Sequence, residues 1–179
     1  MIKAALFLIF CFASMQAAAF AVPENASEGI EFQRSLLAAI ERADRIIVRE
    51  HSDPMDFDDG GETLPAAPEK TYVRKELSGF QKLRFASLVR AMSPVTQDAF
   101  PACIPEYHHT IGFIDKARRT RTVKICFRCG QLEFEGARTS PPASIYTTLS
   151  IFVHEIGMVP KRDWEKLART TAAAHARSR

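Results

Sequence analysis

Three cysteines in the second half of the chain are the residues best suited to chemistry. Cys126 and Cys129 are separated by two residues and followed by Gly130, and Cys103 lies upstream of them. Cysteines at this spacing can bind a metal ion, form a disulfide or act as a redox pair. Residues three apart on a regular strand point to opposite faces, so these two sulfurs can share a partner only across a turn or bulge. Gly130 favours such a turn because glycine adopts positive φ readily.

Two alternating segments bring histidines toward these cysteines. Residues 106–115 and 122–135 each alternate apolar and polar side chains, and a short basic link, residues 116–121, joins them. This pattern predicts a β-hairpin. A turn within the link places residue 109 roughly opposite residue 126, within a register error of a few residues.

The hairpin predicts a metal site at its open end. Cys103, Cys126 and Cys129 would supply three sulfur ligands, and His108 would supply a nitrogen, with His109 as its substitute. A tetrahedral set of three cysteines and one histidine is typical of structural zinc. Zinc is therefore the one cofactor that the residues suggest.

A disulfide explains the same cysteines without a metal. Cys103 would pair with Cys126 or Cys129, and the third thiol would be buried. A thiol–disulfide redox role for Cys126 and Cys129 is a further alternative, but redox pairs of this kind lie at helix N-termini and this segment has the pattern of a strand. No third group is arranged to support a cysteine nucleophile. The residues favour a non-enzymatic binding or interaction protein and leave zinc and disulfide both open.

The N-terminus predicts export. Lys3 precedes an apolar run over residues 4–13, and Ala19-Phe20-Ala21 has small residues at the positions that signal peptidase recognises. We expect residues 1–21 to be a signal peptide and the mature chain to be secreted or periplasmic, where oxidising conditions favour disulfides. No second long apolar run follows, so no transmembrane segment is expected after cleavage.

The remaining composition indicates one small domain with two polar segments. The chain carries 24 basic and 21 acidic residues, and loss of Lys3 would leave a net charge of +2 (24 − 1 − 21). The sequence lacks the interleaved basic and aromatic residues that are typical of nucleic-acid binding. We therefore expect a protein or envelope partner of unknown identity. Residues 22–160 form the predicted domain, residues 50–70 an acidic exposed loop, and residues 161–179 a basic, partly helical tail.

Hydrophobic periodicity predicts an α+β fold. Apolar residues recur with helical spacing in some segments and alternate in others, and Ser78 with Gln81 forms a capping-box pattern. We expect an antiparallel sheet of about four strands with helices packed mainly on one face. The predicted helices span 28–43, 79–92 and 145–156, with a last one capped by Asp163, and the predicted strands span 45–50, 71–77, 106–115 and 122–135. In the second helix we expect Phe80, Leu83, Leu88 and Met92 to point inward.

The segment from Cys103 to Pro160 resembles an uncharacterised group of exported bacterial proteins. The shared pattern is C-x4-H, a polar turn, I-C-F-x-C on a strand, and a closing helix before residues like Gly157 to Pro160. The resemblance implies export and favours His108 over His109 as the partner of the cysteines, and it implies no activity. The residues that carry it are Cys103, His108, Ile125, Cys126, Phe127 and Cys129.

Overall fold

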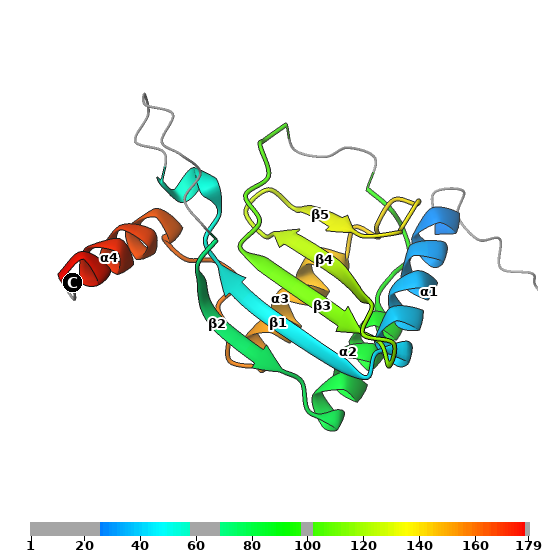
Figure 1. The fold of residues 1–179 in the computed structure, drawn as a ribbon. Helices are drawn as coiled ribbons and strands as arrows, with labels where there is room; N and C mark the ends of the chain where they lie inside the picture. Colours follow the sequence, from blue (N-terminus) through cyan, green and yellow to red (C-terminus); the bar gives the residue numbers. More distant parts are fainter. Residues whose placement is uncertain (1–25, 58–68, 98–101, 178–179) are drawn as a thin grey trace, which may run out of the picture.

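The computed structural model describes residues 26–57, 69–97 and 102–177 (Figure 1). The predicted signal peptide lies outside these residues, as does most of the predicted acidic loop. In the part of the chain that is described, no helix is both long enough and apolar enough to cross a bilayer.

A five-stranded antiparallel sheet with the order β2-β1-β3-β4-β5 forms the centre of the molecule (Figure 1). The predicted α+β class is confirmed, although the sheet has five strands rather than about four. The strands are β1 (Arg45–His51), β2 (Thr71–Glu76), β3 (His109–Ile114), β4 (Thr120–Cys126) and β5 (Gln131–Phe134).

The extra strand arises within the predicted strand 122–135. The chain turns after Cys126, Gly130 adopts a φ of 59°, and β5 folds back on β4 so that Cys126 pairs with Gln131. A glycine at positive φ is what a tight turn of this kind requires. The expected turn between Cys126 and Cys129 is therefore present. In the hairpin formed by β3 and β4, His109 pairs with Ile125, one residue from the predicted register.

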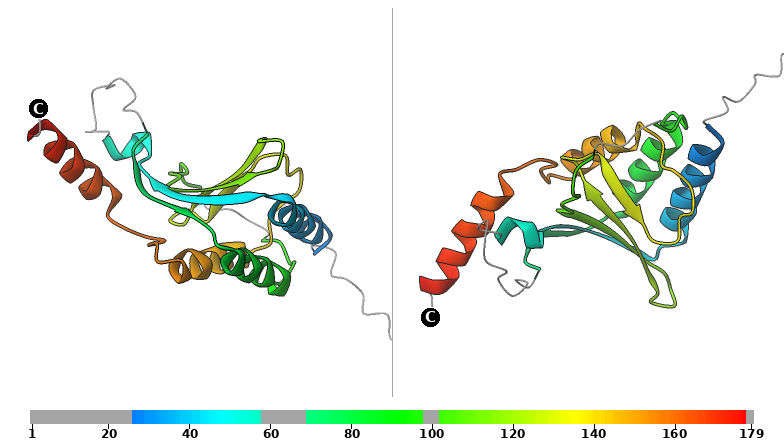
Figure 2. Two further views of the ribbon diagram at one scale, coloured as in Figure 1. Left: turned by 60° about the horizontal axis from the view of Figure 1, so that its bottom comes forward. Right: turned by 90° about the horizontal axis from the view of Figure 1, so that it is seen from above.

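Three helices cover one face of the sheet, and a fourth lies beyond its end (Figure 2). Alternate strand residues such as Ile46, Val48 and Ile111 are buried beneath the helices, as the alternating pattern predicts. The helices are α1 (Ser27–Arg42), α2 (Gly79–Ala91), α3 (Ile145–Glu155) and α4 (Trp164–Arg177).

Helix α2 begins as predicted but presents a different face to the core. Ser78 and Gln81 form the expected capping box. The expectation that Phe80 and Leu83 point inward is wrong, because their exposed fractions are 79% and 70%. Phe85 is the buried aromatic residue of this helix, and five positions at 3.6 residues per turn put Phe80 about 140° around the helix from it.

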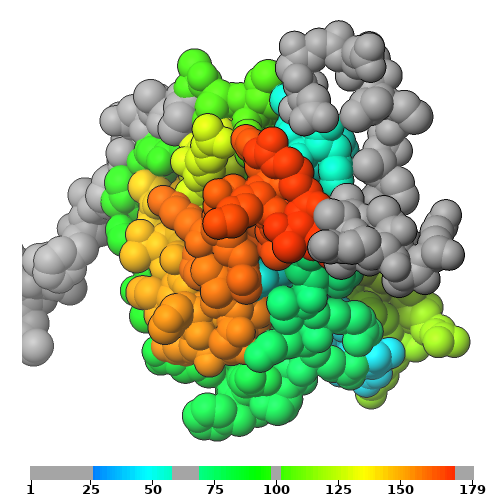
Figure 3. All heavy atoms as spheres, turned by 90° about the vertical axis from the view of Figure 1, so that its left-hand side faces the viewer, coloured from blue at the N-terminus to red at the C-terminus, as the bar shows by residue number. Residues whose placement is uncertain are grey.

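One end of the sheet collects most of the polar residues that could form a site. The C-terminus of β1, the N-terminus of β3 and the turn between β4 and β5 meet there because the strands are antiparallel. A short 3-10 helix, η2 (Pro54–Phe57), follows β1 at this end and contacts α4. Figure 3 shows the orange-to-red residues that follow α3 crossing this end beside the cyan η2 turn.

Candidate functional site

Of the three cysteines among the described residues, two form a disulfide and one remains a thiol. Cys103 is bonded to Cys129, with 6.2 Å between their Cα atoms, and Cys126 is free and buried. The backbone N–H of Cys129 donates a hydrogen bond to Cys126 Sγ at 3.3 Å. The disulfide ties the segment before β3 to the turn between β4 and β5. Cys129, which the redox alternative pairs with Cys126, has Cys103 as its partner.

The disulfide removes two thiolates from the predicted set of zinc ligands. Cys103 and Cys129, two of the four, are bonded to each other and present no thiolate. His108 makes its closest polar contact with a carboxylate instead, because its Nε2 lies 2.8 Å from Asp56 Oδ1. Of the two arrangements that the cysteines allowed, the disulfide is the one present in this structure.

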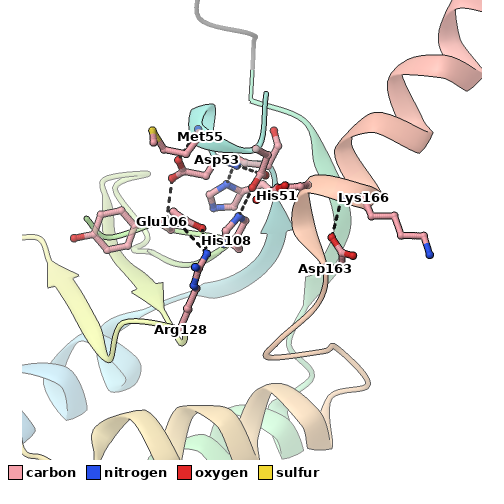
Figure 4. Close-up of polar contacts among 12 residues, drawn as sticks. His51, Asp53, Met55, Glu106, His108, Arg128, Asp163 and Lys166 are labelled. Atoms are coloured by element: carbon pink, nitrogen blue, oxygen red, sulfur yellow. Dashed lines mark hydrogen bonds and ion pairs between the residues drawn. The ribbon is translucent and has the colours of Figure 1, made fainter. Parts of the chain in front are cut away.

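Asp56 reaches His108 because η2 is braced against the start of β3. The Asp53 N–H donates to Asp56 Oδ2 at 2.8 Å, and the Tyr107 N–H donates to Asp53 Oδ2 at 2.9 Å (Figure 4). The His51 N–H also donates to the His108 carbonyl oxygen at 3.0 Å. Asp56 and His51 are buried, so this part of the predicted exposed loop is not solvated as expected. Asp53-Pro54 is a turn-initiating dipeptide, but no local pattern indicates that Asp56 would face His108.

His51 is buried with a partner on each ring nitrogen. Its Nε2 lies 2.8 Å from Thr110 Oγ1 and its Nδ1 lies 3.0 Å from the Ser52 carbonyl oxygen. A carbonyl oxygen only accepts hydrogen bonds, so Nδ1 carries the proton of the neutral ring and Nε2 accepts from Thr110. Burial lowers the pKa of His51 below its usual value. This imidazole therefore has no nitrogen to spare for a ligand.

His109 is fully buried and unsatisfied. Neither ring nitrogen has a hydrogen-bond partner of good geometry among the described residues. The ring instead makes edge contacts with Phe127 and Trp164, at centroid distances of 5.0 Å and 5.6 Å. Burial lowers the pKa of His109 to about 3, with His108 and His51 acting in the same direction and the Val159 backbone opposing them. The ring is therefore neutral near pH 7 and has a free lone pair.

Trp164 packs against aromatic rings at this end of the sheet. Its indole ring stacks on the His108 ring with centroids 4.4 Å apart and on the Tyr72 ring at 6.3 Å. The expected cap of the last helix is present, because Asp163 Oδ1 accepts from the Lys166 N–H at 2.9 Å. The predicted tail is thus joined to the domain through a tryptophan that packs against the histidines.

A cavity of about 290 Å³ lies between η2, the start of β3, the turn after β4 and the start of α4. We call it the histidine cavity. Arg128 and Arg162 are also at its walls, so the lining combines acids, bases, imidazoles and aromatic rings. The acids, imidazoles and aromatic rings of its lining include Asp56, Glu106, His108, His109, Phe127 and Trp164.

Within the histidine cavity, Asp56, Glu106 and His108 form a cluster of candidate metal ligands. Each offers one ligand atom, and these atoms all lie within 4.8 Å of one another. The Glu106 carboxylate also accepts from Arg128 Nη1, at 3.3 Å and 3.4 Å for its two oxygens. Of this cluster, the sequence predicted only His108, because the two acids come from segments without a metal-binding spacing.

Comparison of the chain with known protein families, with curated proteins and with solved structures finds no match. The resemblance of Cys103–Pro160 to exported bacterial proteins therefore stays a prediction.

Proposed function

We propose that this protein is an exported, non-enzymatic binding protein and that the histidine cavity is its binding site. The observation that carries this proposal is the fully buried His109 ring, which lines the cavity and has no hydrogen-bond partner of good geometry among the described residues. A buried polar group without a partner costs about 1–3 kcal/mol, and such groups are rare in native proteins. A ligand that enters the cavity would supply the missing bond.

The disulfide supports this role because it holds one wall of the cavity. The turn that carries Cys129 also carries Phe127, which contacts the edge of His109, and Arg128, which binds Glu106. Cys103 anchors this turn to the segment that leads into Glu106 and His108. A wall fixed before binding lowers the entropy cost of binding, as expected for a preformed site.

Export is the second part of the proposal. The signal-peptide pattern and the disulfide agree with an oxidising compartment such as the periplasm. Expression of the full chain in a bacterium, followed by mass spectrometry of the periplasmic fraction, tests it. We expect a mature chain that begins at Val22. A full-length product confined to the cytoplasm would contradict export.

Trp164 provides a direct test of the cavity, because it is the chain's single tryptophan and stacks on His108. The mature untagged protein is titrated with acetate, inorganic phosphate, imidazole and Zn²⁺ while Trp164 fluorescence is recorded. We expect at least one probe to give a saturable change. His109→Phe should abolish that change, and the matched control His154→Phe, at an exposed position on α3, should retain it. No saturable change with any probe would refute the proposal.

A second candidate function is thiol–disulfide exchange. The free Cys126 lies three residues from the bonded Cys129, and the Cys129 N–H donates to Cys126 Sγ. The Cys126 thiolate would attack Cys129 Sγ, forming a Cys126–Cys129 bond and releasing Cys103 as a thiolate. Peptide mapping after incubation in glutathione redox buffers tests this, because exchange requires a measurable Cys126–Cys129 species.

A further inference from the structure

We propose that the histidine cavity binds a divalent transition-metal ion of the zinc class through Asp56, Glu106 and His108. This inference rests on the proposed binding function and names the ligand. The three candidate ligand atoms already lie within 4.8 Å of one another. Ligand atoms around a tetrahedral zinc ion are about 3.3–3.6 Å apart, so closure requires movements of about an ångström.

The second observation that points to a ligand is His109. Its ring is fully buried and lines the same cavity, and within the described ranges neither ring nitrogen has a hydrogen-bond partner of good geometry. It follows His108 directly in the chain, and both rings contact Trp164. His109 is not among the clustered ligand atoms, so its role in this site would be to form a hydrogen bond with a metal-bound water.

The donor types select the class of ion. One imidazole nitrogen with two carboxylates suits zinc, cobalt and related ions, whereas calcium and magnesium prefer oxygen donors alone. The disulfide removes Cys103 and Cys129 as thiolate competitors. The inferred site thus differs from the sulfur-rich site that the sequence predicted. His108 is a ligand in both sites, and His109, its substitute in the predicted site, lies beside the inferred one.

Metal binding would replace the hydrogen bond between Asp56 and His108. A proton on His108 Nε2 now joins it to Asp56 Oδ1 at 2.8 Å. Metal binding would break this N–H bond, release the proton to water and form bonds from Nε2 and Oδ1 to the ion. Asp56 Oδ2 would keep its hydrogen bond from the Asp53 N–H, which orients the carboxylate.

Glu106 can exchange its present partner for the ion at low cost. Arg128 is 75% exposed, and its contacts with Glu106 are long, at 3.3 Å and 3.4 Å. Exposed ion pairs of this kind contribute little to stability, so breaking this one opposes metal binding only weakly. Arg128 would then return to solvent.

Titration of the untagged mature protein with Zn²⁺, Co²⁺, Ca²⁺ and Mg²⁺, without reductant, tests the inference by calorimetry and Trp164 fluorescence. We expect one Zn²⁺ or Co²⁺ per chain and much weaker binding of Ca²⁺ and Mg²⁺. The Co²⁺ spectrum should lack a thiolate charge-transfer band, because no cysteine is a ligand.

Glu106→Gln should weaken Zn²⁺ binding by about tenfold or more. The matched control is Glu133→Gln, which removes another carboxylate bonded to a basic side chain, Lys124, and should leave Zn²⁺ affinity unchanged. Unaltered affinity in Glu106→Gln, a thiolate band, or no binding of Zn²⁺ and Co²⁺ would each overturn the metal site. If acetate, phosphate or imidazole still bound in a His109-dependent manner, the binding function would stand and only the metal would fail.

Discussion

Glu50 and His109 pair across strands β1 and β3, and both are fully buried, yet among the described residues only the carboxylate has a close polar partner of good geometry. Glu50 Oε1 accepts from the Val159 N–H at 2.6 Å, and Glu50 Oε2 lies 3.0 Å from Arg162 Nη2. Glu50 therefore fastens the segment after α3 to the sheet. Two neighbouring buried polar groups thus differ in role, because one holds the fold together and the other is the group that we propose meets a ligand.

Replacing Glu50 should destabilise the domain strongly. Glu50→Ala leaves the Val159 N–H and part of the Arg162 charge without a partner, and we expect a loss of about 2–4 kcal/mol in the free energy of unfolding. Arg162 is partly exposed, so solvent screens some of that ion pair. Glu76→Ala, which removes a carboxylate from an exposed pair with Arg45, should cost less than about 1 kcal/mol in the same urea titration. Equal losses in both variants would contradict the anchoring role.

The stability of the metal-free protein should fall as the pH falls below about 6.5, in part because of His109. The unfolded histidine takes up a proton near pH 6.5, whereas the folded one does so only near its pKa of about 3. Between these values the unfolded state binds more protons, at a cost of up to about 1.4 kcal/mol per pH unit. The charged or titratable groups around it are His108, His51, Glu50 and Arg162.

Urea unfolding of chelator-treated protein between pH 7 and pH 4 measures this slope. His109→Phe should flatten the slope and leave stability at pH 7 unchanged or higher, because the ring makes no hydrogen bond of good geometry with the described residues. His51, whose pKa burial also lowers, supplies part of the remaining slope. The control His154→Phe should keep the wild-type slope. Parallel curves for His109→Phe and wild type would show that His109 is not the buried neutral group described here.

In the folded mature protein, we expect one cysteine thiol to be inaccessible to alkylating reagents. Without reductant, we expect alkylation of Cys126 only after unfolding, and a cross-linked peptide that contains Cys103 and Cys129. Cys103→Ser should lower stability by about 3 kcal/mol, since the disulfide spans 26 residues. Cys126→Ala should keep the disulfide and cost less. Rapid labelling of Cys126 in the folded protein would contradict its burial.

The face that α2 presents to the core can be tested with two matched substitutions. Phe85 is fully buried and stacks on Phe152 with centroids 4.4 Å apart, whereas Phe80 is 79% exposed. Phe85→Ala should cost about 3–5 kcal/mol and Phe80→Ala less than about 0.5 kcal/mol. Thermal unfolding followed by circular dichroism measures both. A larger cost at Phe80 would restore the orientation that the sequence alone suggested.

Most elements could be predicted because their signals are local. The capping box at Ser78 and Gln81, the turn at Gly130 and the positive φ of Gly157 after α3 each follow from a few adjacent residues. The error at Phe80 and Leu83 has a physical reason: α2 has apolar residues on more than one face, so periodicity alone could not decide which face the sheet would cover. The error in strand number arose between β4 and β5, where the alternation changes phase from Phe127 to Leu132 across the turn.

The sequence by itself determined the α+β class, the order of the helices and of four of the five strands, and the turn that separates Cys126 from Cys129. Only the tertiary structure decided that Cys103 bonds to Cys129 and that Asp56 meets His108. Asp56 and His108 are 52 residues apart and meet because β1 pairs with β3 and η2 folds back over the end of the sheet. Local propensity acts over a few residues, whereas the choice of partner depends on which distant segments pack together, and no short pattern encodes that choice.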